Sequence, residues 1–272
     1  IENYDPAVIW IPKSPTMQNF IDAWEVLAPA TLMRNTLAVT VITTIFQVVV
    51  CLLVGYGFAR FKFKGNGILF ALVILTIIVP PQNLATSLYS SYRYFDILGI
   101  MGMLEGPTGG RIAPINLIGT YWVSWLPAML GVGLRSGLYI YMYRQYFLGI
   151  PRELEEAAAI DGCGPYATFM RIMVPNTKNI VLTVFLFSIV WNWNDFYTPA
   201  MYMQNRLTLA KALSEFQNNL QMIVGGVNTD PIVVLTRIQA AALMAIIPLL
   251  VLYILTQKYF TESIENTGIT GI

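Results

Sequence analysis

Five apolar segments set the strongest limit on what this chain can fold into. They cover residues 35–59, 67–89, 117–147, 179–203 and 238–257. A helix needs about 20 mostly apolar residues to cross the hydrocarbon core of a membrane. A chain within lipid must also satisfy its backbone hydrogen bonds internally, as a helix does. The sequence therefore predicts an all-α membrane protein with about five spans.

Prolines bear on the shape of three of these segments. Pro80 and Pro81 fall inside the second segment, and Pro248 falls inside the fifth. The third segment is too long for one straight span, and it contains Pro127 together with several glycines. Proline removes a helical hydrogen bond and kinks or ends a helix. We therefore expect the second and third segments to be bent or broken.

Lysine and arginine residues in short loops indicate how the spans are oriented. Arg60, Lys62 and Lys64 form the densest basic cluster and follow the first span. Basic loops tend to stay in the cytoplasm, so this loop should be cytoplasmic. The next loop should lie outside, and the loop at 148–178, which carries further basic residues, should return to the cytoplasm.

The same orientation predicts two parts of unequal size. Residues 1–34 would be an extracytoplasmic N-terminal segment, and residues 35–272 would form a single transmembrane domain. A polar segment on the outer side needs an earlier span to carry it across the membrane. Since the chain starts with Ile1, we expect one more span upstream, which would give six in the intact protein.

Composition excludes several classes of function. Charged residues make up 11% of the 272 residues, against roughly a quarter in soluble domains. The net charge of +1 offers nothing to a nucleic acid. The chain has no histidine, and its two cysteines do not have the spacing of a metal site. It also lacks a phosphate-binding loop. We therefore predict that it is not an enzyme and binds no metal or cofactor.

One stretch, "RELEEAAAIDGCGPYATFMRIMVP" at 152–175, is rich in acids and alanines for so apolar a chain. Pro151 can occupy the first turn of a helix, and the glycines within 162–164 can end it. Pro165 can start a second helix, which Pro175 should end. We predict two short helices joined by a glycine turn at the cytoplasmic surface.

Helical spacing gives each of these helices a distinct face. The first face contains Leu154, Ala157, Ala158 and Asp161, and the second is an apolar stripe of Tyr166, Phe169, Met170 and Met173. The stripe could rest on the ends of the membrane helices, while Glu156 and Asp161 present charge to a soluble partner. An ordinary amphipathic connector with a solvated acidic face would explain the same pattern.

The spacing of this stretch is similar to the signature loop of the permease subunits of binding-protein-dependent ABC importers. That loop reads E-A-A, three residues, G, nine residues, then I-x-L-P. The matching positions are Glu156, Ala157, Ala158, Gly162, Ile172, Val174 and Pro175, with Val174 in place of leucine. The stretches "LEEAAAIDG", "RIMVP", "WNWNDFYTP" and "QKYF" resemble the carbohydrate-uptake branch, the maltose-type permeases.

This resemblance implies a fold and a role. The fold would be the type I importer permease fold, in a multi-pass protein of the bacterial cytoplasmic membrane. The role would be ATP-driven import of a carbohydrate, a sugar or oligosaccharide that could be acidic, by alternating access. The loop would couple the chain to ATPases through Glu156, Ala157, Ala158, Asp161 and Gly162.

The resemblance also implies partners. These are a second homologous permease subunit in a heterodimer, two ATP-binding subunits that hold ATP and Mg²⁺, and an extracytoplasmic solute-binding protein. Membrane lipid and the carbohydrate itself complete the set, and no nucleic acid is expected.

Polar residues in the fourth segment are candidates for the substrate pathway. They are Trp191, Asn192, Asn194 and Asp195, in "WNWNDF". Aromatic faces with amide and carboxylate groups suit sugars, and a carboxylate at membrane depth needs water or a partner. The same residues could instead hydrogen-bond neighbouring helices or sit in the interfacial aromatic belt.

Residues in the second and third segments are further candidates. Arg135 lies within the third segment, where it could snorkel outward or line the pathway and meet an anionic substrate. Gln82, Asn83 and Tyr89 follow the proline break of the second segment. Irregular backbone at that depth is tolerated only against protein or a water-filled cavity.

Two other functions compete with the importer. An ion-gradient-driven secondary transporter would need a coupling carboxylate near the midplane, and Asp195 is the one acid that could serve. An intramembrane enzyme would need a catalytic constellation, and the lack of histidine and of paired acids counts against it.

Overall fold

The computed structural model describes residues 16–27, 29–96, 113–204, 206, 208–216, 218 and 231–268, and for 29, 231, 232 and 258–268 the backbone only. Within these residues the chain is helical, with one isolated β-bridge between Phe95 and Ile115. The all-α prediction is confirmed.

The helices follow one another along the chain with short connections. They are α1 (Gln18–Leu27), α2 (Pro29–Arg60), α3 (Asn66–Ile78), η2 (Pro81–Leu84), α4 (Ala85–Arg93), α5 (Trp122–Met129), α6 (Ser136–Gly149), α7 (Glu153–Ile160), α8 (Pro165–Thr168), η4 (Phe169–Met173), α9 (Val174–Asn176), α10 (Lys178–Trp193), α11 (Tyr197–Tyr202), α12 (Leu209–Ser214) and α14 (Pro231–Gly268).

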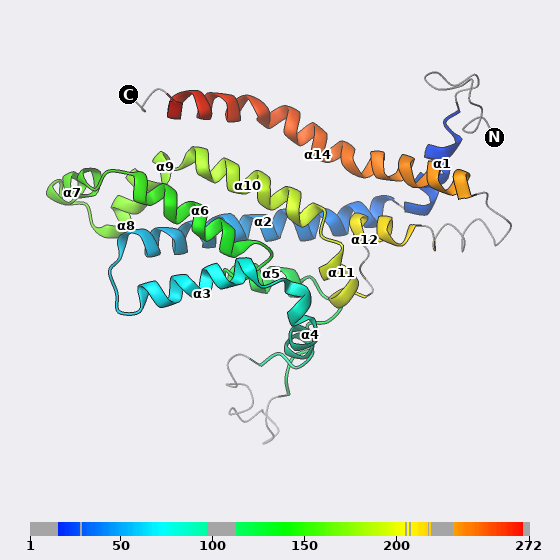
Figure 1. Cartoon of the computed structure of the whole chain (residues 1–272), viewed down its shortest axis with the longest axis horizontal. Coiled ribbons are helices and arrows are strands. Elements are labelled where there is room, and N and C mark those ends of the chain that lie inside the picture. Colours follow the sequence, from blue (N-terminus) through cyan, green and yellow to red (C-terminus); the bar gives the residue numbers. More distant parts are fainter. Residues whose placement is uncertain are drawn as a thin grey trace.

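Helix α2 is the centre of the molecule. It packs against α5, α6 and α10, which lie along it in Figure 1. The crossing with α6 is close at Gly55, where an added Cβ would lie 2.5 Å from the Cβ of Tyr143. Small residues let membrane helices approach closely enough to pack their backbones. The size of Gly55 therefore sets the separation of α2 and α6.

Two helices in the described part are long and apolar enough to cross a membrane unaided, Ala30–Arg60 and Val233–Gln257. Two bent pairs could add spans. The pair Asn66–Ile78 and Pro81–Arg93 is bent by 101°, and the pair Pro165–Asn176 and Lys178–Trp193 by 74°. The first bend lies at the Pro80–Pro81 break, as predicted.

The third apolar segment is interrupted, as predicted, between α5 and α6. The break contains Gly131, with φ of 72°, and Arg135, with φ of 61°. Pro127 lies inside α5 and does not itself mark the break. Helix α5 ends at Met129, and the chain enters left-handed backbone at Gly131, a conformation that favours glycine.

Several predicted boundaries differ from the structure. Helix α10 ends at Trp193, well before residue 203, and α14 continues beyond the predicted 238–257 at both ends. Pro175 does not end the second loop helix, because the chain stays helical through Asn176. A π-helical turn at Phe169–Met173 precedes it. A proline in the first turn of α9 breaks no hydrogen bond that the turn needs.

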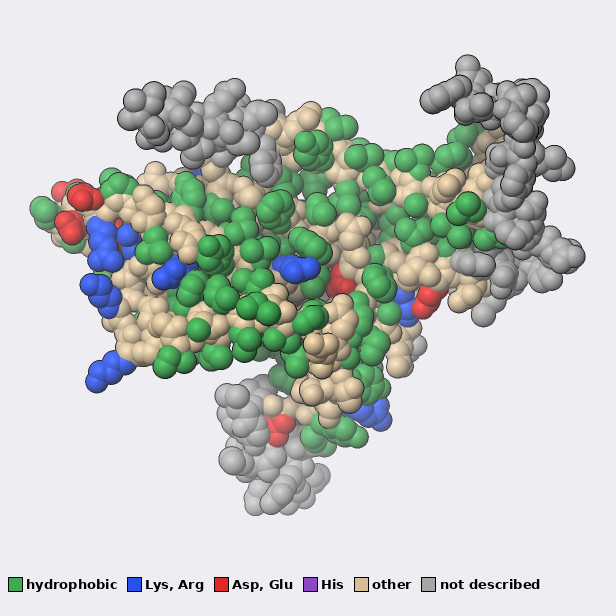
Figure 2. All heavy atoms as spheres, in the orientation of Figure 1, with side chains coloured by type: hydrophobic (Ala, Val, Ile, Leu, Met, Phe, Trp, Pro, Cys, Tyr) green, Lys and Arg blue, Asp and Glu red, His purple; other side chains and the backbone are tan. Residues whose placement is uncertain are grey.

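The surface is mostly apolar along its middle, and charged side chains gather at one end (Figure 2). Figure 2 shows basic side chains gathered at the end of the molecule that carries α7, with acidic side chains beside them. The α2–α3 turn, with Lys62 and Lys64, lies at this same end (Figure 1). The two loops predicted to share one membrane face therefore share one end of the molecule, which we call the α7 end.

Candidate functional site

The loop between the third and fourth apolar segments forms a projecting pair of helices. Helix α7 has Glu153, Glu155 and Glu156 in its first turn, where carboxylates are favoured by the helix dipole. After α7 the chain turns at Gly162, whose φ is 81°. A residue with a Cβ is strained in this left-handed conformation, which explains the glycine in the turn.

The second helix of the pair is anchored to the membrane helices by part of its apolar stripe. Phe169 and Met173 are buried in a hydrophobic cluster with Tyr56 of α2 and Phe147 of α6. The prediction was right for these two residues. It was wrong for Tyr166 and Met170, which are 76% and 47% exposed. The buried face of this helix is therefore narrower than the predicted stripe.

A link between the loop and α2 is formed by Glu155. Its carboxylate lies 3.0 Å from the guanidinium of Arg60 and accepts a hydrogen bond of 2.7 Å from the hydroxyl of Tyr56. Arg60 also donates to the backbone carbonyl of Ile150 at 2.7 Å. The side chains of Arg60 and Glu155 are 6% and 20% exposed. We call these contacts the Glu155–Arg60 link.

Sequence reasoning missed this link. Glu155 stands next to Glu156, and both fit an acidic first turn equally well. The partners of Glu155, which are Tyr56 and Arg60, lie nearly one hundred residues earlier in the chain, and nothing in the local pattern marks them. The signal that could have found it is the basic residue that ends the first span, because a buried arginine at a helix end needs an acceptor.

The residues predicted to couple the chain to ATPases lie mainly on the exposed side of the loop. Glu156, Ala157, Asp161 and Gly162 are exposed, whereas Ala158 is buried against the chain itself. Ile160, beside Asp161, is 86% exposed. An exposed large apolar side chain next to carboxylates is typical of a surface that another protein covers.

The amide of Asn192 lies in a buried polar network at the centre of the helices. Asn192 and Ser188 both donate to the side-chain carbonyl of Gln47, at 2.8 Å and 2.6 Å. Gln47 in turn donates to the backbone carbonyl of Leu134 at 2.6 Å. The network joins α2, α10 and the α5–α6 break, so the structure favours the packing interpretation of Asn192.

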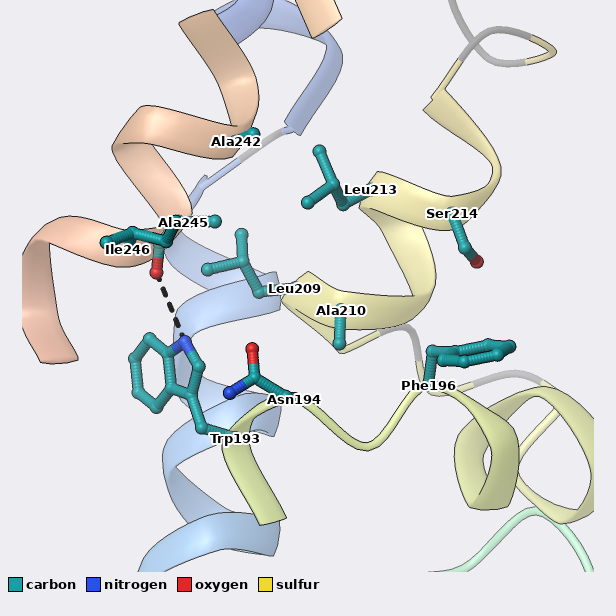
Figure 3. Close-up of a pocket in the computed structure, with 10 residues that line it drawn as sticks. All are labelled: Trp193, Asn194, Phe196, Leu209, Ala210, Leu213, Ser214, Ala242, Ala245 and Ile246. Atoms are coloured by element: carbon teal, nitrogen blue, oxygen red, sulfur yellow. Dashed lines mark hydrogen bonds between the residues drawn. The ribbon is translucent and has the colours of Figure 1, made fainter. Parts of the chain in front are cut away.

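The neighbours of Asn192 line a cavity of about 300 Å³ between α10, α12 and α14, drawn in Figure 3. Trp193 donates from its indole N–H to the carbonyl of Ala245 at 3.1 Å, and this bond holds α10 to α14. Asn194 and Phe196 line the cavity on the α10 side. Asp195 accepts a hydrogen bond from the backbone N–H of Thr198, so it stabilises the turn into α11.

The remaining predicted pathway residues lie in two different places. Gln82 and Asn83 are exposed on η2, and Tyr89 belongs to a hydrophobic cluster around Leu117 and Tyr202. Arg135 and Trp191, by contrast, lie together, with the guanidinium 4.2 Å from the centre of the indole ring. The structure thus brings Arg135 to the "WNWNDF" motif and leaves the second segment apart from it.

Within the described residues, no group of three or more histidine, cysteine, aspartate or glutamate side chains could hold a metal ion.

Comparisons with known proteins agree on one class. The family model described as "Binding-protein-dependent transport system inner membrane component" matches residues 48–263. The probable ABC transporter permease protein YurM of Bacillus subtilis is 30% identical over 96% of this chain and 76% of its own. The melibiose/raffinose/stachyose import permease protein MelC of the same organism is 28% identical, over 96% of this chain and 84% of its own.

A solved structure shows the same fold. It is the crystal structure of a bacterial ABC transporter involved in the import of the acidic polysaccharide alginate. One of its chains superposes with a TM-score of 0.62 and 17% sequence identity, covering 88% of this chain and 79% of that chain.

Proposed function

The chain belongs to the family of inner membrane components of binding-protein-dependent transport systems, and from this membership we propose that it is the membrane subunit of an ATP-driven importer of a carbohydrate. It moves a sugar or an oligosaccharide across the cytoplasmic membrane by alternating access. The carbohydrate is supported by relatives named for arabinooligosaccharides and for melibiose, raffinose and stachyose.

The observation that carries the coupling mechanism is the Glu155–Arg60 link. The exposed side of α7 is the surface that a cytoplasmic ATPase subunit binds. The residues bound are Glu156, Ala157, Asp161 and Gly162. A displacement of α7 reaches α2 through Glu155, Arg60 and Tyr56. A charge-assisted, largely buried contact resists stretching better than one exposed to water. Since α2 packs on α6 and α10, its movement tilts the helices that surround the break.

The partners follow from this mechanism. ATP and Mg²⁺ are bound by two separate ATPase subunits, and a second homologous permease subunit completes the pathway as a heterodimer. An extracytoplasmic solute-binding protein delivers the carbohydrate. This chain supplies membrane helices of the pathway and the α7 surface that an ATPase subunit binds, and it performs no chemistry of its own.

Reversing the charge of Glu156 tests the proposal. In the transporter purified with its partner subunits, we expect Glu156→Lys to lower ATP hydrolysis stimulated by the loaded binding protein at least about tenfold. That is the effect of replacing one charge-assisted contact with a repulsive one. Glu153→Lys, a change on the same first turn, is the matched control and should retain most of the activity.

The opposite result would support the ion-gradient-driven alternative. A chain purified free of any ATPase that still moved sugar into vesicles under a proton or sodium gradient would overturn the importer. The importer would also be contradicted if the Glu156→Lys transporter hydrolysed ATP at the native rate, provided that the native and variant transporters assemble equally well.

A further inference from the structure

Arg135 has a backbone conformation unlike that of other residues with side chains. It is the one non-glycine residue with positive φ in the described part of the chain, at 61°. A left-handed conformation costs an L-residue about 1–2 kcal/mol. Such strain persists where the surroundings hold it, and it is concentrated at functional positions. The surroundings here are well defined, because Gln47 binds the preceding carbonyl of Leu134 and contacts Ser136.

The depth of Arg135 follows from two helices. Arg135 directly precedes the 14 residues of α6, which run to the α7 end. At a rise of 1.5 Å per residue, it lies about 20 Å from the α7 end of that helix. Its partner Trp191 is the third residue from the end of the 16-residue α10, which starts at the same end, so its depth is also about 20 Å. The hydrocarbon core is about 30 Å thick, so both residues lie well inside it.

The guanidinium does not snorkel outward. It lies over the ring of Trp191, 4.2 Å from its centre. Side chains on a helix point back toward its N-terminus, and the N-terminus of α10 is at the α7 end. The ring is therefore no farther out than the backbone of Trp191, and the positive charge stays at that depth.

The guanidinium is also exposed, and it forms no ion pair with another described side chain. Arg135 is exposed, as is Trp191 at 42%. The ion pairs among the described side chains are Arg60–Glu155 and Arg237–Asp22, both elsewhere. An arginine cannot face hydrocarbon at this depth without a large cost, so the exposed face of this pair meets water or protein. One face of the guanidinium is covered by the indole, which leaves its N–H edge open.

We propose that Arg135, held on Trp191, binds the carboxylate of an acidic sugar within the translocation pathway. This proposal rests on the proposed function and adds the chemical class of the substrate. A planar guanidinium edge matches a carboxylate with two parallel hydrogen bonds. The start of α6, which has no side-chain cap, adds the positive end of a helix dipole. The exposed indole edge offers an apolar surface to the sugar ring.

Access to water is the first test. The parent is Cys163→Ser, which keeps the fully buried Cys51. In the assembled transporter without nucleotide, we expect Arg135→Cys to react with a negatively charged, membrane-impermeant methanethiosulfonate, whereas the parent does not. Absence of reaction would place this position against lipid or a partner subunit and would overturn the proposal.

Selection of the carboxylate is the second test, with D-glucuronate and D-glucose as probes that differ in this group. The difference in tryptophan fluorescence between the native transporter and its Trp191→Phe variant gives the signal of Trp191. We expect glucuronate, and not glucose, to change it saturably. Arg135→Gln should weaken the effect at least about tenfold, the loss of one charge-assisted hydrogen bond, and Arg135→Lys should retain part of it.

Equal responses to the two sugars, or a glucuronate response that survives Arg135→Gln, would contradict the proposal. Neither test uses ATP hydrolysis or uptake, so their failure is distinguishable from failure of the importer function. Thermal stability of Arg135→Gln close to native shows that the change acts on binding and not on the fold.

Discussion

Two neighbouring glutamates, Glu155 and Glu156, have identical side chains but different surroundings. Glu156 projects from α7 into solvent, whereas Glu155 turns back to Arg60 and Tyr56. The sequence identifies both as acids of a first helical turn and gives no reason to distinguish them. The contacts that distinguish Glu155 span nearly one hundred residues of chain, so local periodicity does not predict them. The candidate site was therefore predictable as an exposed loop, but its attachment was not.

The attachment gives a prediction at the residue scale. Glu155→Gln keeps the shape of the side chain and removes its charge, so it leaves the largely buried Arg60 without an anionic partner. We expect binding-protein-stimulated ATP hydrolysis and uptake to fall several-fold, while ATPase subunits still co-purify, because the exposed side of α7 is unchanged. Thermal unfolding should show a loss of about 1–3 kcal/mol. Glu153→Gln, an exposed acid of the same turn, is the control.

A different outcome would show that the link is not part of coupling. If Glu155→Gln lowered uptake only in proportion to the amount of folded protein, the Glu155–Arg60 link would be a stabilising contact alone.

At the scale of helices, the sequence predicted most of what depends on composition. Segment lengths gave α2 and the core of α14, and Pro80–Pro81 gave the bend after α3. The end of α10 was not predicted, because the mostly apolar and aromatic residues at 196–203 extend the fourth segment beyond Trp193. What ends the helix is the hydrogen bond from the N–H of Thr198 to Asp195, a local competitor of the helical pattern.

Helix separation gives the prediction at this scale. Gly55→Ala puts a methyl group 2.5 Å from the Cβ of Tyr143, so α2 and α6 must move apart. We expect a loss of about 1–3 kcal/mol in stability, the usual effect of overpacking, measured as thermal unfolding of the purified transporter. Gly57→Ala is a matched control two residues along the same helix, where an added Cβ meets nothing within 4 Å.

Equal stability of the two variants would show that the α2–α6 crossing tolerates a wider separation. The close packing at Gly55 would then not set the position of α2. The α2–α6 contact would not be a rigid part of the connection from α7 to α6.

At the scale of the whole molecule, the apolar middle and the charged α7 end give the chain a direction in the membrane (Figure 2). The loop basic residues predicted that direction, and the structure places the α2–α3 turn and α7 together at one end (Figure 1). The break between α5 and α6, the Gln47 network and the Arg135–Trp191 pair lie at depth between the ends. A conformational change that starts at α7 has α2 as its most direct route to this central region.

The central claim is that α7 faces the cytoplasm and is covered there by an ATPase subunit, and native Cys163 tests it directly. Cys163 is partly exposed beside Gly162, whereas Cys51 is fully buried, so a membrane-impermeant maleimide has one accessible cysteine in this chain. We predict labelling in inside-out vesicles stripped of ATPase subunits, none in right-side-out vesicles, protection when those subunits are restored, and no signal from Cys163→Ser. Labelling of Cys163 in sealed right-side-out vesicles, or labelling unaffected by the ATPase subunits, would contradict the account.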